Sequence, residues 1–301
     1  MSEPTVVVAG ATGSLGGRIV RALLERGARV KALVRSSTAP DRVEGLRQLG
    51  VAIVTANVNS ASEVTPACKG ASCVVSALNG LRNVIVEAQS VLLDAATRAG
   101  VPRFFPSDYS IDFTRLPPGS NRNLDLRREF HQRLDAASIA ATTVWCGAFM
   151  ELLTAQMPLI LFKRKRVLYW GSADQRMDFT TVGDTAAYTA RAALDPATPR
   201  FLRIAGDQLS AREIAAVMSD LTGSRFRLLR AGGLRTLGAI IKVARLVAPA
   251  KHEIFPAWQG MQYMRNMFDG RAVLAPLDND RYPGMRWTTV RDLLAAFLQR
   301  A

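Results

Sequence analysis

The feature that most constrains the fold is a glycine-rich turn near the amino terminus. In the stretch TVVVAGATGSLGG, glycines at positions 10, 13 and 16 directly follow an apolar run over residues 5–9. Residues 15–26 then show apolar positions at the spacing of an amphipathic helix. A strand, a tight glycine turn and a helix make up the first half of a βαβ unit, which predicts a parallel sheet.

The same alternation of apolar runs and helical patterns continues through the first half of the chain. We expect strands at 5–9, 30–34, 52–55, 73–77, 103–106 and 141–146, and helices at 15–26, 42–49, 61–69, 82–99 and 124–137. This order predicts an α/β fold, a Rossmann-type doubly wound parallel sheet with helices on both faces and right-handed crossovers.

The pattern changes after Cys146. The stretch KRKRVLYWGSADQRMDFTTV predicts one or two strands around a glycine turn. A later helix has Ser210 as its N-cap, Glu213 at the capping-box position and Gly223 as its C-cap. We therefore expect a Rossmann domain over residues 1–150 and a smaller, mostly carboxy-terminal lobe over 151–301. We expect the segment around 178–195 to pack back on the first domain.

The glycine turn also has a chemical interpretation. A dinucleotide site requires a sharp turn, close approach of a diphosphate to the backbone, and free N–H groups at the start of a helix. The spacing found here meets these requirements, whereas a tight turn rich in glycine for packing alone is the alternative. The expected cofactor-binding residues of this turn are Gly10, Thr12, Gly13, Ser14, Leu15 and Gly16.

The end of the second strand indicates which dinucleotide is bound. NAD sites usually place an acidic residue there to bind the ribose 2′-hydroxyl. This chain has Arg35 followed by Ser36, Ser37 and Thr38. An arginine fork and hydroxyl groups suit a 2′-phosphate, so we expect NADP(H).

Ligands of such sheets bind outside the carboxyl ends of the strands, so the ends of strands four and five complete the expected cofactor site. The residues at these two ends are Ser76, Ala77, Leu78, Pro106, Ser107 and Asp108, followed by Tyr109.

Several motifs together resemble the NmrA-like and isoflavone-reductase-like branch of the atypical short-chain dehydrogenases. They are GATGSLG, ALVRSST, RFFPSDY, MDFTTVGDTAAYTA and RYPGMRWTTVRDLL, and they span nearly the whole chain. The resemblance implies a Rossmann domain, a smaller substrate lobe and a cleft between them. It also implies NADPH-dependent reduction of phenylpropanoid-type compounds, although other members of the branch bind NADP and act as redox-sensing regulators.

The chain departs from this resemblance at the residues that would perform catalysis. The Tyr-x-x-x-Lys pair is absent, because Phe113 follows Tyr109 at that spacing. Matching the helix after strand five to the reductase branch puts Arg127 in the position of the catalytic lysine. Arginine is a poor general acid or base, so we expect it to orient substrate or cofactor. His131, on the same helical face, is the predicted proton relay, with Tyr109 as the alternative. An exposed, structural role for His131 is the competing interpretation.

The net charge of +14 fits either nucleic-acid binding or an electropositive cleft for anions. The arginines form no long run and alternate with no stacking aromatics, so we expect a cleft and no specific nucleic acid. Cys68, Cys73 and Cys146 show no metal spacing, and we expect buried thiols, no metal and a cytoplasmic location.

The remaining candidates concern the second half of the chain. Two interpretations are open for a set of mostly aromatic residues: they line an aromatic substrate pocket, or they belong to an ordinary core. The residues are Tyr169, Trp170, Trp258, Tyr263 and Met264. The basic amphipathic stretch LRTLGAIIKVARLVAPA is either a helix over the substrate cleft, which we expect, or a membrane-touching helix. We therefore expect a small-molecule substrate and no membrane partner. The leading hypothesis is an NADPH-dependent reductase of a small aromatic or carbonyl-bearing compound. The alternative is an NADP(H)-sensing regulator with a protein partner and without turnover.

Overall fold

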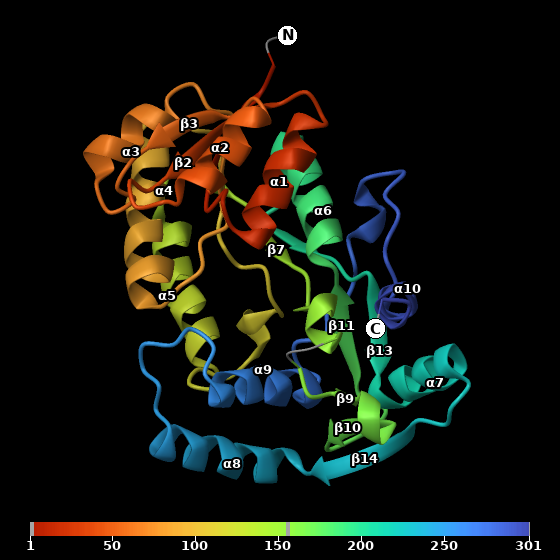
Figure 1. Ribbon diagram of the computed structural model, residues 1–301. Coiled ribbons are helices and arrows are strands. Elements are labelled where there is room, and N and C mark those ends of the chain that lie inside the picture. The colour runs from red at the N-terminus through yellow and green to blue at the C-terminus, as the bar shows by residue number, and fades with distance from the viewer. Residues whose placement is uncertain (1–2, 155–156, 301) are drawn as a thin grey trace. The chain divides into compact units, whose positions relative to one another are not determined.

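The structure is a computed structural model that describes residues 3–154 and 157–300 (Figure 1). The chain forms two compact units. Unit 1 comprises Met1–Tyr109, Leu126–Val144 and Thr185–Leu202. Unit 2 comprises Ser110–Asp125, Trp145–Asp184 and Arg203–Ala301.

Unit 1 is built on a six-stranded sheet in the order β3-β2-β1-β4-β5-β6, in which every neighbouring pair is parallel. The strands are β1 Thr5–Ala9, β2 Arg29–Val34, β3 Ala52–Thr55, β4 Cys73–Ser76, β5 Arg103–Phe105 and β6 Ala140–Ala141. The order reverses between β1 and β4, which confirms the predicted doubly wound sheet. Ligands of such sheets bind at this reversal point, outside the carboxyl ends of the strands.

The helices of unit 1 lie on both faces of this sheet. They are α1 Ser14–Leu24, α2 Pro40–Gln48, α3 Ala61–Cys68, α4 Gln89–Arg98, α5 Arg122–Ala136 and α6 Val182–Leu194. Helices α3, α4 and α5 share one core with the sheet, whereas α1 and α6 lie on the other side (Figure 1). Phe104 of β5 packs on Phe130 of α5, with ring centroids 6.2 Å apart. This contact fixes α5 against the strand whose carboxyl end carries several candidate residues.

Two predicted elements differ in detail. The helix expected at 82–99 begins as a π-helical turn, Asn83–Ala88, before α4. The strand expected at 141–146 is divided into β6 and β7 Thr143–Trp145. The division arises because the N–H of Thr142 donates to the carbonyl of Phe104, whereas the next N–H, of Thr143, donates to the carbonyl of Arg200.

The described part of unit 2 consists of further strands and helices. Its strands are β8 Ala148–Phe149, β9 Ile160–Leu161, β10 Arg166–Trp170, β11 Arg176–Thr180, β13 Asp207–Ser210 and β14 Arg227–Gly232, and its helices are α7 Ala211–Thr222, α8 Leu234–Val247, α9 Ala257–Asp269 and α10 Val290–Leu298. The predicted strands around a glycine turn are β10 and β11, which join two different three-stranded sheets. The capping box of Ser210 and Glu213 is present as expected.

Each unit is made of three separate segments of the chain, whereas the sequence predicted a single boundary at residue 150. Residues 110–125 belong to unit 2, because the N–H groups of Cys146 and Gly147 both donate to the carbonyl of Ser110. Residues 185–202, which include most of α6, belong to unit 1. The predicted roles of the two parts, cofactor binding and substrate binding, stay predictions.

All three cysteines are buried, and none of them forms a disulfide bond within residues 3–154 and 157–300. Burial raises the pKa of Cys68 to about 11 and also raises the pKa of Cys73 on β4. Such thiols stay protonated near neutral pH and are poor nucleophiles. In residues 3–154 and 157–300 no helix is long and apolar enough to cross a membrane, and no three His, Cys, Asp or Glu side chains are grouped to hold a metal ion.

Candidate active site

The glycine turn between β1 and α1 has three glycines with different roles. Gly10 has a φ of +82°, and a Cβ there would lie 2.5 Å from the carbonyl oxygen of Ala77. A Cβ on Gly16 would lie 2.1 Å from the carbonyl oxygen of Gly10. Both positions are too crowded for a side chain. Gly13 has a φ of −82°, and a Cβ there would lie 3.3 Å from the Gly10 oxygen. Of the three glycines, Gly13 is therefore the one that a residue with a side chain could replace with the least disturbance of the turn.

The start of α1 is suited to an anion. Gly13 is the N-cap, so no side chain caps the helix, and the first turn contains no acidic residue. The unsatisfied N–H groups and the positive end of the helix dipole attract negative charge. The turn and the helix start therefore form a cradle that fits the diphosphate of a dinucleotide.

A pair of substitutions separates packing from ligand binding in this turn. Gly16→Ala should destabilise unit 1 by about 1–3 kcal/mol or more, because its methyl group overlaps backbone atoms. Gly13→Val should leave the protein folded but weaken binding of a dinucleotide, because its side chain occupies the diphosphate cradle. Thermal unfolding and calorimetric titration of both variants test this. Unchanged dinucleotide affinity in a folded Gly13→Val variant would contradict the assignment of the turn.

Arg35 follows β2 directly, as predicted, and its side chain is exposed. A small turn fixes its backbone: the N–H of Arg35 donates to Oγ1 of Thr38 over 3.1 Å, and the N–H of Thr38 donates to the carbonyl of Arg35. Within the described part of the chain, no acidic group pairs with the Arg35 guanidinium. The charge at the end of β2 is thus available for an anionic ligand.

The ends of β4 and β5 are tied to each other and to the glycine turn. The N–H of Ala77 donates to the carbonyl of Ala9, and the Ser107 hydroxyl donates to the carbonyl of Leu78 over 2.6 Å. Ser76 is fully buried, and its hydroxyl has no hydrogen-bond partner among residues 3–154 and 157–300. A buried hydroxyl of this kind fits a site completed by a ligand.

His131 contacts Asp108 in the interior of unit 1. Its Nε2 lies 2.5 Å from Oδ2 of Asp108, and both side chains are buried. The two residues come from different elements, the end of β5 and the middle of α5. The sequence predicted both as site residues without predicting their contact. The competing interpretation of His131 as an exposed helix residue is wrong.

One face of α5 presents the candidate catalytic residues. Arg127, Phe130, His131 and Leu134 are all buried, at the i, i+3, i+4 and i+7 spacing of one helical face. Phe130 and Leu134 belong to the hydrophobic core, which holds the other two side chains against β5. Nε of Arg127 donates to the carbonyl of Ser107 over 3.0 Å. Arg127 therefore anchors the segment that carries Asp108.

Three further residues support this segment and were not predicted. The amide of buried Gln89 on α4 accepts the N–H of Ser107 over 2.8 Å. The Thr143 hydroxyl donates to Oδ2 of Asp108 over 2.9 Å and accepts a hydrogen bond of 2.9 Å from Arg200. The sequence gives little indication of these roles, because glutamine is common within helices and threonine is common next to strands.

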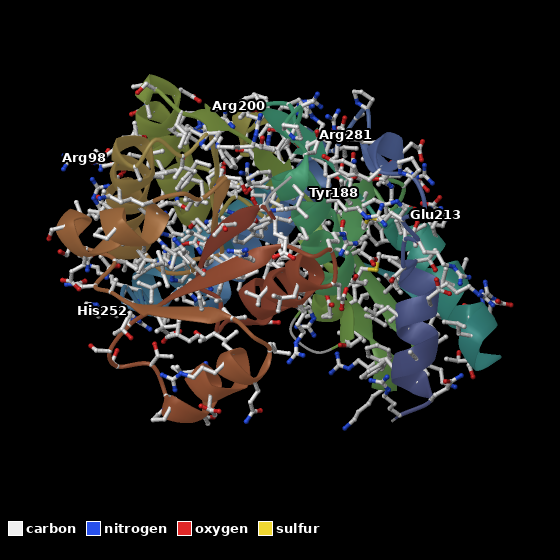
Figure 2. All side chains as sticks on the ribbon, turned by 90° about the horizontal axis from the view of Figure 1, so that it is seen from above. Arg98, Tyr188, Arg200, Glu213, His252 and Arg281 are labelled. Atoms are coloured by element: carbon white, nitrogen blue, oxygen red, sulfur yellow. The ribbon has the colours of Figure 1, made fainter. Side chains whose placement is uncertain are left out.

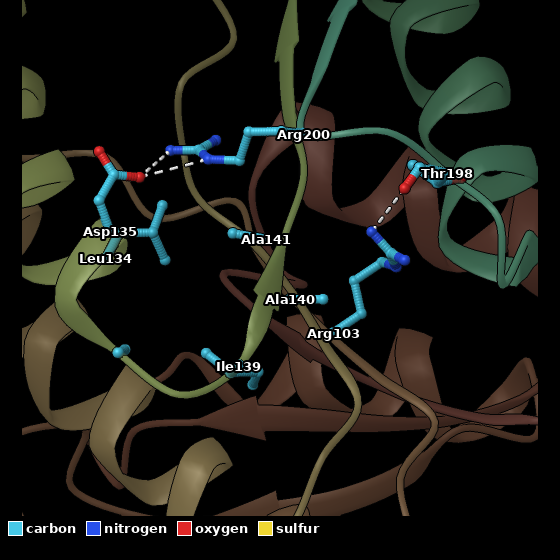
Figure 3. Close-up of a pocket in the computed structure, with 9 residues that line it drawn as sticks. Arg103, Leu134, Asp135, Ile139, Ala140, Ala141, Thr198 and Arg200 are labelled. Atoms are coloured by element: carbon cyan, nitrogen blue, oxygen red, sulfur yellow. Dashed lines mark hydrogen bonds and ion pairs between the residues drawn. The ribbon is translucent and has the colours of Figure 1, made fainter.

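A surface pocket lies at the β6 edge of the sheet (Figure 3). It is lined in part by Arg103, Asp135, Thr198 and Arg200. The Arg200 guanidinium pairs with Asp135 over 2.8 Å, and Nη1 of Arg103 donates to the carbonyl of Thr198. Figure 3 draws both interactions. No predicted site residue lines this pocket, but Arg200 connects it to Asp108 through Thr143.

The remaining predicted residues have less definite positions. Tyr109 is buried and directly follows Asp108, as the last residue of the first segment of unit 1. The aromatic candidates lie in unit 2, with Tyr169 and Trp170 on β10 and the others on α9. The Trp258 ring there contacts the guanidinium groups of Arg122 and Arg245. A substrate-binding role for these residues stays a prediction.

The model of the NmrA-like family matches residues 2–274 of this chain. The chain belongs to this family. The predicted resemblance is therefore confirmed over most of its length.

Several proteins similar to this chain are named as reductases. Pinoresinol reductase 1 of Arabidopsis thaliana is 31% identical over 238 residues, which cover 72% of this chain and 74% of that protein. Phenylcoumaran benzylic ether reductase PT1 of Pinus taeda is 26% identical over 316 residues, 99% of each chain. The solved structure of AtPrR2 with NADP+ and (+)-pinoresinol superimposes with a TM-score of 0.82 at 23% identity and covers 99% of each chain. The structural likeness confirms the fold.

Proposed function

We propose that this protein is an NADPH-dependent reductase of a small aromatic or carbonyl-bearing compound. The observation that carries the proposal is the buried Asp108–His131 pair, because Asp108 lies just beyond the carboxyl end of β5, at the same edge of the sheet as the glycine turn. The names of the family relatives, pinoresinol and phenylcoumaran benzylic ether reductases, support the substrate class.

The residues present fit an NADP(H) molecule. The glycine cradle and the uncapped start of α1 suit the diphosphate, and Arg35 suits the 2′-phosphate. The buried Ser76 hydroxyl provides a polar group for a ligand at the end of β4. When bound, NADPH supplies a hydride.

The other half of a reduction is a proton, and the chain's own residues would manage it. Asp108 holds the His131 ring in one orientation through its Oδ2, as a carboxylate does for a catalytic imidazole. Thr143 fixes the same carboxylate oxygen. His131 is the proposed proton relay, Tyr109 is the alternative, and Arg127 has an orienting role.

Cofactor preference tests the first part of this proposal. NADPH should bind more tightly than NADH, and Arg35→Ala should weaken NADPH binding by about 1.5–3 kcal/mol, a loss of about 10-fold to 150-fold, without changing NADH affinity. Calorimetric titration measures both affinities. Arg98→Ala is a matched control, because this exposed arginine, labelled in Figure 2, lies at the end of α4 that precedes β5. Equal affinities for the two dinucleotides would refute the proposed specificity.

One observation favours a second function, an NADP(H)-sensing regulator without turnover. Arg127 occupies the position in which the resembling reductases carry a lysine, and its Nε is engaged with the carbonyl of Ser107. Such a protein would bind NADPH tightly and signal through a protein partner, and it would not oxidise NADPH with any substrate.

A further inference from the structure

One segment of unit 2 combines positive charge with exposed apolar side chains. Between positions 221 and 252 the chain has seven arginines and lysines and no aspartate or glutamate. The basic residues are Arg225, Arg227, Arg230, Arg235, Lys242, Arg245 and Lys251. Among residues 3–154 and 157–300, none of these seven pairs with a carboxylate. The segment, which includes α8 and reaches His252 (labelled in Figure 2), therefore presents uncompensated positive charge.

Helix α8 has two apolar sides. Leu237 and Ile241 are buried on the side that packs beside α9 (Figure 1). A second stripe is exposed: the exposed fraction is 40% for Ile240, 60% for Val243, 83% for Leu246 and 76% for Val247. The spacing of three, three and one residues places this stripe on one side of the helix.

The charged residues border the exposed stripe. On a helical wheel of 100° per residue, Arg235 and Lys242 lie together next to Leu246, at one margin of the stripe. Phe255, a further exposed apolar residue, follows the helix and is 59% exposed. An apolar strip with basic residues along its margin is the pattern of helices that lie in the interface of an anionic bilayer.

We propose that α8 docks on the surface of a membrane that contains anionic phospholipids. Ile240, Val243, Leu246 and Val247 would enter the interface, and the neighbouring arginines and lysines would contact the lipid phosphates. Charge complementarity favours this occupant over a second copy of the chain. A symmetric contact through α8 would bring the same uncompensated positive charges together. This proposal departs from the expectation of no membrane partner, and it does not rest on the proposed enzymatic activity.

Vesicle sedimentation tests this proposal with the full chain. The protein should sediment with phosphatidylcholine vesicles that contain about 30% phosphatidylglycerol and remain in the supernatant with phosphatidylcholine alone. Raising the salt from about 0.15 M to about 0.5 M should weaken the binding. The double variant Leu246→Glu with Val247→Glu should reduce partitioning at least about tenfold. Because both side chains are exposed, circular dichroism and NADPH affinity should be unchanged.

A matched pair separates local charge from net charge. Arg235→Gln with Lys242→Gln should reduce partitioning by about fivefold for each charge removed. Arg42→Gln with Lys69→Gln makes the same change in net charge at exposed positions of unit 1 and should have a much smaller effect. No sedimentation with anionic vesicles, equal sedimentation with neutral ones, or equal losses in both pairs would overturn the proposal. A dimer in light scattering that the Leu246→Glu, Val247→Glu variant dissociates, without vesicle binding, would assign the stripe to a second copy.

Discussion

Replacing His131 with alanine is expected to lower kcat of the reductase reaction by about 10²–10⁴-fold, the usual contribution of a positioned general acid. The reason is the contact of 2.5 Å between His131 and Asp108, which holds the ring in one orientation inside unit 1. NADPH affinity should change little, because His131 is not among the residues proposed to hold the cofactor. The measurement is steady-state loss of nicotinamide absorbance with a substrate that the wild type reduces.

Asp108→Asn should produce a loss of the same kind, because the amide preserves the shape of the side chain but removes the carboxylate that holds the His131 ring in its orientation. The chain has two histidines, and His252 is exposed in unit 2. His252→Ala is therefore the matched control and should keep the full rate. If His131→Ala also keeps the full rate while Tyr109→Phe loses it, the proton relay is Tyr109. If both keep it, the assignment of a proton relay to this segment is wrong.

Replacing Arg127 with alanine should lower turnover by about a hundredfold, the cost of a misplacement of about an ångström at a catalytic group. Arg127 is buried and holds the carbonyl of Ser107 over 3.0 Å, one residue before Asp108. Its loss removes a charged hydrogen bond and leaves a cavity, so the segment after β5 should shift. Arg133→Ala on the same helix, at an exposed position, is the control. Turnover like that of the wild type in Arg127→Ala would contradict the anchoring role.

Arg127→Lys separates the two proposed functions. The resemblance predicts a lysine at this position in the reductases, and lysine can exchange a proton, which arginine does not readily do. In a reductase that relies on His131, this variant should be no faster than the wild type. If the wild type oxidises NADPH with none of the compounds tested, whereas the Arg127→Lys variant oxidises it with one of them, the chain is a cofactor-binding relative that lacks its proton-transfer group.

Much of the fold could be predicted from the sequence because its signals are local. The glycine turn after an apolar run, and the alternation of strands with amphipathic helices, depend on residues close together in the chain. The order of strands then follows from the doubly wound pattern. The break between β6 and β7 could not be predicted, because it depends on the Arg200 carbonyl, far along the chain.

The candidate site was predictable residue by residue but not as a network. The ends of β4 and β5 were found because the ends of parallel strands share one edge of the sheet. The contact between Asp108 and His131 depends on the packing of Phe130 on Phe104, which sets the position of α5. Thr143 and Arg200 join the network through tertiary contacts alone, so no local pattern marks them.

Turnover of NADPH by the wild-type protein tests the central claim most directly. The measurement is the nicotinamide absorbance during incubation with aromatic enones, quinones, aldehydes and lignan-type ethers, with product identified by mass spectrometry. The reductase assignment predicts that at least one of these compounds is reduced in proportion to the NADPH consumed, and that the rate falls in His131→Ala. Tight NADPH binding with no oxidation by any compound would contradict it.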